Sequence, residues 1–151
     1  VEGIERLVCW DRAQPRTPML EADRIFVGGL EESVGVRLVR WLRRRAQQTL
    51  ERETMEIARR EGLTVTSVNI GDPRSRWGSC AVNGAIRYSW RLILAPPDVR
   101  RATVAHEVAH LLHMDHSAHF HAAHERLLGS DPRPARAWLR EHGAALHRFT
   151  V

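Results

Sequence analysis

The chain has 151 residues, which suits one compact domain that buries about two-thirds of its unfolded surface, and its two cysteines are too few for a disulfide-stapled scaffold. Its 23 basic residues are all arginines and exceed the 18 acidic ones, and the net charge of +5 would suit a polyanionic partner. No apolar run approaches the ~20 residues of a membrane span and no secretory pattern is present, so we expect a cytoplasmic protein with no membrane partner.

Two short strands are predicted near the start of the chain. Residues 4–10 and 24–28 are rich in β-branched and aromatic side chains, and the loop between them contains Pro15 and Pro18. We therefore expect a small N-terminal sheet or hairpin.

A long helix is predicted from about residue 31 to residue 60. Apolar residues recur along it at near-helical spacing, and Gly62 supplies a stop. Its arginine cluster is followed by glutamates, so a solvated charged face is favoured over a nucleic-acid groove. The arginines are Arg37, Arg40, Arg43, Arg44 and Arg45, and the glutamates are Glu51, Glu53, Glu56 and Glu61.

Strand patterns resume after the long helix. Residues 63–70 read as a strand, although its alternation changes register, and residues 71–73 (Gly-Asp-Pro) end it. Asn83-Gly84 between two short β-prone runs predicts a hairpin turn in which both residues take a positive φ. The edge of such a hairpin could bind an extended peptide as an added strand, but the sequence does not fix which edge.

Three further helices are expected. Pro97 fits the first turn of the first one, which contains the histidine motif described next. Ser117 can cap a second helix that runs to about Leu128 before Gly129, and a third covers roughly residues 134–147. The prediction is an α+β fold: a small antiparallel sheet packed against a metal-binding helix, with a long helix in the N-terminal half and helices at the C-terminus.

The most informative stretch is His106-Glu107-Val108-Ala109-His110. On a helix, positions 106 and 110 lie one turn apart and about 40° from each other around the axis, so both imidazoles can bind one ion. Glu107 lies roughly 100° away, where its carboxylate can reach a water beside that ion. Surface histidines are the ordinary alternative, but the neighbouring residues are apolar, and two His and a Glu are expensive to bury without a metal.

The third metal ligand is expected to be His116. On an unbroken helix His116 would point roughly 100° away from the first two histidines, so the chain must turn between about residues 112 and 115. The alternatives remain open, and they are Glu125, His119, His124 and His113. Two or three imidazoles with one open position are typical of catalytic Zn²⁺.

Several motifs in order resemble the YgjP-like metal-dependent hydrolases, which are relatives of the SprT-type zinc metallopeptidases. These motifs are Arg76-Trp77-Gly78-Ser79-Cys80, Trp90-Arg91-Leu92-Ile93, Pro96-Pro97, His106-Glu107-x-x-His110 and Asp115-His116-Ser117-x-x-Phe120. His121 and Ser89 depart from the family pattern, which puts the shape of the substrate cleft in doubt and leaves the metal motif intact.

The resemblance implies a single zincin-like metallohydrolase domain over residues 1–151. It also implies that His106, His110 and His116 bind zinc and that Glu107 is the catalytic base. The expected reaction is hydrolysis of a peptide bond in a peptide or protein substrate, with Glu107 taking a proton from a water beside the metal. Asp115 could orient an imidazole, and candidate donors to the developing oxyanion are Tyr88, Arg76, His119 and His113.

Two other functions remain possible from the sequence. A metal site of this kind could attack a nucleotide phosphoanhydride, and the arginine surplus would suit that substrate. A nucleic-acid-binding module with a structural zinc is the other alternative, which predicts four protein ligands and a steep salt dependence of binding.

Overall fold

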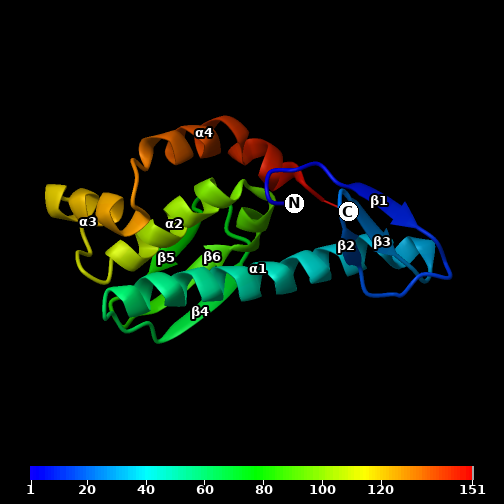
Figure 1. Cartoon of the computed structure of the whole chain (residues 1–151), viewed down its shortest axis with the longest axis horizontal. Helices are drawn as coiled ribbons and strands as arrows, with labels where there is room; N and C mark the ends of the chain where they lie inside the picture. The colour runs from blue at the N-terminus through cyan, green and yellow to red at the C-terminus, as the bar shows by residue number, and fades with distance from the viewer. Residues whose placement is uncertain (151) are drawn as a thin grey trace.

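The computed structural model describes residues 1–150, and Figure 1 shows its arrangement. The helix α1 runs along the length of the molecule, with a first sheet at one end and a second sheet beside its other end. The described residues contain no helix that combines the length and the apolar character needed to cross a membrane. The strands are β1 (Leu7–Trp10), β2 (Met19–Glu21), β3 (Arg24–Val27), β4 (Ser67–Gly71), β5 (Gly78–Cys80) and β6 (Ala85–Ser89). The helices are α1 (Val34–Arg60), α2 (Pro97–Ala109), α3 (Ala118–Leu128) and α4 (Arg133–Arg148), with 3-10 turns η1 (Glu31–Ser33) and η2 (Trp90–Leu94).

The prediction of an α+β fold is confirmed, but the expected antiparallel sheet is wrong. The second sheet is mixed and has the order β4-β6-β5, with β6 parallel to β4 and antiparallel to β5. After β5 the hairpin turn reverses the chain and places β6 between β4 and β5. There β6 runs in the same direction as β4. Of the predicted 63–70 strand only residues 67–70 pair with β6, and the pairing continues to Gly71, where the strand was expected to have ended.

The N-terminal sheet is also mixed. Its order is β1-β3-β2, and β1 runs parallel to β3 while β2 runs antiparallel to it. The strand β2 lies inside the segment that the prolines predicted as a loop. Pro18 immediately precedes it, where a missing N–H costs no ladder hydrogen bond, so the proline did not prevent pairing.

The predicted hairpin is confirmed, but its turn differs from the expected two-residue type. Gly84 N–H donates to Ala81 O at 3.0 Å, and only Gly84 in the turn has a positive φ, of 88°. A three-residue turn closed by one left-handed glycine needs no positive φ at Asn83. The Asn83 side chain instead accepts a hydrogen bond from Ala85 N–H at 3.0 Å.

The core lies between α1, the second sheet and α2. The buried side of α1 is a stripe in which Leu38, Leu42, Ala46 and Leu50 follow one another at intervals of four residues. This stripe covers η2, β4 and α2, as the apolar spacing of the sequence predicted.

One glutamate of α1 is not on the solvated face that we expected. Glu53 is buried and accepts hydrogen bonds from Arg100 of α2, with Arg100 Nη2 to Glu53 Oε1 at 2.7 Å. A charge can be buried in this way because an opposite charge on the facing helix pairs with it. The ion pair therefore fixes α1 against the helix that carries the histidine motif.

The helix α4 packs over α2 and is held near its C-terminal end. Arg91 of η2 donates to Leu146 O and to Phe149 O, both at 2.7 Å, and its Nε donates to Asp72 Oδ1 at 2.8 Å. At Gly143 of α4 an added Cβ would lie 2.9 Å from the Trp77 ring, so the two elements are in close contact. Figure 1 shows α4 crossing above α2.

Candidate metal centre

The helix α2 carries the first residues of the site. It begins at Pro97, as predicted, and its buried residues include Val104, Ala105 and Val108, which fix the face that bears the motif against the core. The helix ends at Ala109, earlier than the turn expected between residues 112 and 115. Its last turn tightens, because the N–H groups of residues 110 and 111 bond to carbonyls three residues back.

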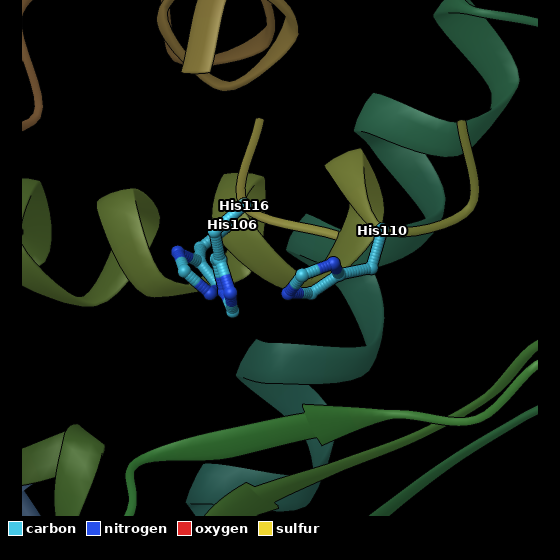
Figure 2. Close-up of side chains that lie close together, drawn as sticks. All are labelled: His106, His110 and His116. Atoms are coloured by element: carbon cyan, nitrogen blue, oxygen red, sulfur yellow. The ribbon is translucent and has the colours of Figure 1, made fainter. Parts of the chain in front are cut away.

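His110 is the C-cap residue of α2. Because the helix ends there, the chain folds back before α3 begins, and His116 comes to lie beside His106 and His110. Nitrogen atoms of His106, His110 and His116 all lie within 4.8 Å of one another. Figure 2 shows the ring of His110 pointing toward the rings of the other two histidines. The structure thus brings together the three histidines that the sequence singled out.

Two of the three histidines, His106 and His110, are held in the form that can bind a metal. Burial, helped by neighbouring His124, His110 and His116, lowers the pKa of His106 to about 3. Burial also lowers the pKa of His110, against a hydrogen bond to His113 O that raises it. Neutral imidazoles are required for metal binding, so the environment favours this state before any ion arrives.

The surroundings also orient the rings. His110 Nδ1 lies 3.0 Å from His113 O, so an Nδ1–H donated to that carbonyl leaves Nε2 free as a ligand. Phe120 is fully buried among the three histidines, with ring centroids 4.9, 4.4 and 5.0 Å from His106, His110 and His116. Ser117 caps α3 by accepting from Phe120 N–H at 3.4 Å, and this cap places the phenyl ring.

Glu107 lies beside this group and is 4% exposed. It packs against Gly78 of β5, where an added Cβ would lie 2.9 Å from both Cγ and Oε1 of Glu107. Burial raises the pKa of Glu107 to about 7, although the Arg76 guanidinium opposes the shift. A carboxyl group with a pKa near neutrality can accept a proton in one step and return it in another.

A cavity of about 230 Å³ opens next to His106 and Glu107. One wall comes from α2 and the segment 76–78, and the other comes from α4 and the residue before it. The described lining residues are Arg76, Trp77, Gly78, Ala102, Thr103, His106, Glu107, His124, Pro132, Ala135, Arg136 and Leu139.

His124 was an open alternative as a ligand, and the structure gives it a different position. Its Nε2 lies 2.8 Å from Ala102 O, which ties α3 to α2, and its Nδ1 is buried without a hydrogen-bond partner among the described residues. Burial lowers its pKa, so the ring is neutral. It lines the cavity and stands 5.2 Å from His106 between ring centroids, outside the group of three.

The remaining candidates lie elsewhere. The rings of His113 and His119 stack on each other at 5.8 Å, and neither residue lines the cavity, nor does Glu125. Tyr88 is fully buried with its hydroxyl 2.8 Å from Thr54 Oγ1, so it supports the core. Of the four expected oxyanion donors, only Arg76 lines the cavity.

Asp115 does not bond to an imidazole. Its Oδ1 accepts from Ser117 N–H at 3.2 Å, so it stabilises the turn before α3. Phe120 belongs to a motif that resembles the family, but the sequence alone assigned it no role, because its place among the three rings depends on how α3 packs. A second sequence signal was its position three residues after a helix-capping serine.

The nitrogens of three imidazoles converge beside a buried carboxylate, and this arrangement fits a divalent metal ion with at least one further coordination position. The family model described as YgjP-like, metallopeptidase domain, matches residues 24–142, a span that includes every residue of the site. No curated protein and no solved structure matches the chain.

Proposed function

Because the chain belongs to the YgjP-like metallopeptidase family, we propose that it is a zinc peptidase in which His106, His110 and His116 bind the metal and Glu107 is the general base. The family makes it a metal-dependent hydrolase, and the identity of the metal, the roles of these residues and the peptide substrate are the parts that we add. One observation carries the proposal: nitrogens of the three imidazoles lie within 4.8 Å of one another, and His106 of this group lines a cavity together with the buried carboxylate of Glu107.

Zinc is the metal we assign, because three imidazoles with an open position match its preferred catalytic coordination. Bound there, zinc would act as a Lewis acid toward the scissile carbonyl and toward the attacking water. Structural zinc sites usually have four protein ligands, and the group among residues 1–150 has three. The ligand count therefore favours a catalytic site over a structural zinc in a nucleic-acid-binding module.

The residues of the chain have separable roles. Glu107 takes a proton from the attacking water and transfers it to the leaving amine, for which a pKa near 7 is suitable. His113 O and Phe120 hold the imidazoles in place. The edge strand β5 starts at Gly78, directly beside Glu107, so an extended peptide that added to this edge would bring its backbone to the base.

The test separates metal binding from turnover. We expect Glu107→Gln to keep one equivalent of zinc, measured by elemental analysis, and to lose at least about 100-fold in hydrolysis of casein-type and peptide substrates. Glu125→Gln is the matched control, because Glu125 is exposed on α3 and does not line the cavity. An undiminished rate in Glu107→Gln would show that the base is another residue.

A second reaction is favoured by one observation, the two arginines that line the cavity. Guanidinium groups suit the phosphates of a nucleotide, and the same site could hydrolyse a phosphoanhydride. A nucleotide panel with phosphate and pyrophosphate detection, run beside the peptide assays, decides between the two substrate classes. Release of pyrophosphate without any peptide cleavage would replace the peptidase proposal.

A further inference from the structure

The charges that line the cavity are unbalanced. Arg76 comes from the segment before β5 and Arg136 comes from α4, so two separate elements each contribute a guanidinium group to the cavity. Glu107 is the only acidic residue among the described lining residues. A divalent ion at the three histidines would add further positive charge to the same space.

Neither arginine has an acidic partner in the described part of the chain, although many other arginines do. Arg91 pairs with Asp72, and Arg100 pairs with Glu53. On the same helix as Arg136, Arg133 pairs with Asp131 at 2.8 Å. The side chains of Arg76 and Arg136 are exposed, which leaves both guanidinium groups free to meet a ligand.

Both arginines lie close to the reactive groups, because they line the same cavity as His106 and Glu107. Between the two arginines the walls are apolar, with Trp77 and Leu139 among them. A concave site with apolar walls and one sign of charge strengthens attraction for the opposite charge.

We propose that Arg76 and Arg136 bind an anionic group of the substrate, which makes acidic peptides the preferred substrates. The inference rests on the proposed peptidase function, and it adds the substrate class. In a peptide the anionic group is a carboxylate, and a guanidinium group can donate two parallel hydrogen bonds to its oxygens. It belongs either to an Asp or Glu side chain near the scissile bond or to the C-terminus of the peptide.

The experiment uses the zinc-loaded full chain and matched peptide pairs. One pair differs by Glu or Gln at positions flanking the scissile bond, and the other has a free or an amidated C-terminus. We expect kcat/KM to be at least about tenfold higher for the charged member of one pair, mainly through KM, and the responsive pair identifies the carboxylate. The preference should weaken as the salt concentration rises.

Variants of the two arginines then test whether these residues cause the preference for charged peptides. Arg76→Gln and Arg136→Gln should each reduce the ratio of charged to neutral kcat/KM by about tenfold. Arg140→Gln is the matched control, because Arg140 is exposed one turn further along α4 and does not line the cavity. Its ratio should equal that of the parent protein.

A binding measurement makes the test independent of turnover. Labelled charged and neutral peptides are titrated by fluorescence anisotropy into Glu107→Gln with zinc, and the charged peptide should bind about tenfold more tightly. Equal kcat/KM and equal affinity within both pairs would overturn the inference while peptide cleavage still supported the peptidase proposal. Tight binding and hydrolysis of nucleotides, with neither for any peptide, would overturn both.

Discussion

At the scale of single residues, the absence of a side chain at position 78 decides how Glu107, the proposed base, is placed. Gly78 does not have a positive φ, so its backbone conformation is open to other residues. The constraint is space, because an added Cβ would lie 2.9 Å from Glu107 Cγ and Oε1. Glu107 is only 4% exposed, so its carboxylate cannot keep its present position beside an added methyl group.

We therefore expect Gly78→Ala to reduce kcat by at least about tenfold while the protein stays folded, because the added methyl group displaces the carboxylate. Peptide turnover measures kcat, and circular dichroism shows whether the variant is still folded. Gly71→Ala is the control in the same sheet, since its Cβ would meet only the guanidinium group of exposed Arg87, which can move. Equal losses in both variants would mean that Gly78 matters to the sheet rather than to the base.

The buried carboxyl group also predicts a dependence of stability on pH in the metal-free protein. Burial raises the pKa of Glu107 from 4.5 to about 7. The folded state therefore holds its proton at pH values where the unfolded state has lost it, so stability falls between pH 4.5 and pH 7 and is constant above. Relative to Glu107→Gln, the parent should lose about 3 kcal/mol of unfolding free energy across this window. Urea unfolding in the presence of a chelator measures it, and a difference that does not vary with pH would contradict the assignment.

At the scale of elements, one buried ion pair sets the position of α2 on α1. Arg100 and Glu53 are 3% and 5% exposed, and Arg100 donates to Glu53 through both Nε and Nη2. Arg101 and Glu2 lie at the edge of the pair, 3.6 Å from Glu53 and 3.5 Å from Arg100. The pair lies two turns before His106, so its loss would disturb the helix that bears the metal-binding motif.

Glu53→Gln should lower the unfolding free energy by about 3 kcal/mol, because the buried guanidinium group loses its closest counter-charge and keeps only Glu2 at 3.5 Å. Urea denaturation gives the value. Glu56→Gln removes the partner of Arg52 in an exposed pair, and its effect should stay below about 1 kcal/mol. Similar losses in the two variants would show that the Glu53 pair contributes no more than a surface contact.

The sequence predicted the structural features that depend on residues close to one another along the chain. The extents of α1 and α3, the start of α2 and the hairpin at Gly84 all follow from local spacing and capping, and the convergence of His106 and His110 follows from helical geometry. It did not predict the parallel pairing of β4 with β6 or the burial of Glu53. These features depend on which distant segment lies opposite, and residue pattern alone does not encode that.

At the scale of the whole molecule, α2 is the central element, since α1, β5, α3 and α4 all contact it. The three histidines lie on α2, on its C-terminal cap and in the connection to α3. A bound metal would therefore join α2 to the start of α3, a connection held otherwise by the Ser117 cap and the packing of Phe120.

Removal of the metal should lower the melting temperature by about 5–10 °C, as expected for an ion present at about 100 times its dissociation constant. Thermal unfolding with chelator and with zinc added back measures the shift. On metal removal, hydrogen exchange should rise over residues 110–118 and stay unchanged in the first sheet.

His116→Gln should abolish most of the response of the melting temperature to zinc, whereas His119→Gln, on α3 outside the group of three, should respond as the parent does. A metal-dependent shift that persists in His116→Gln would exclude His116 as a ligand.

The helix α4 supplies a wall of the cavity and none of the three clustered histidines, and Arg91 fastens it near its far end. In the proposed peptidase, Arg136 of α4 takes part in substrate recognition, while the clustered histidines lie on other segments. Mutations accumulating on the inner side of α4 would then redirect the protein toward new substrates during evolution while the metal site is inherited intact. Descendants of one ancestral hydrolase can diverge by this route without rebuilding their catalytic apparatus.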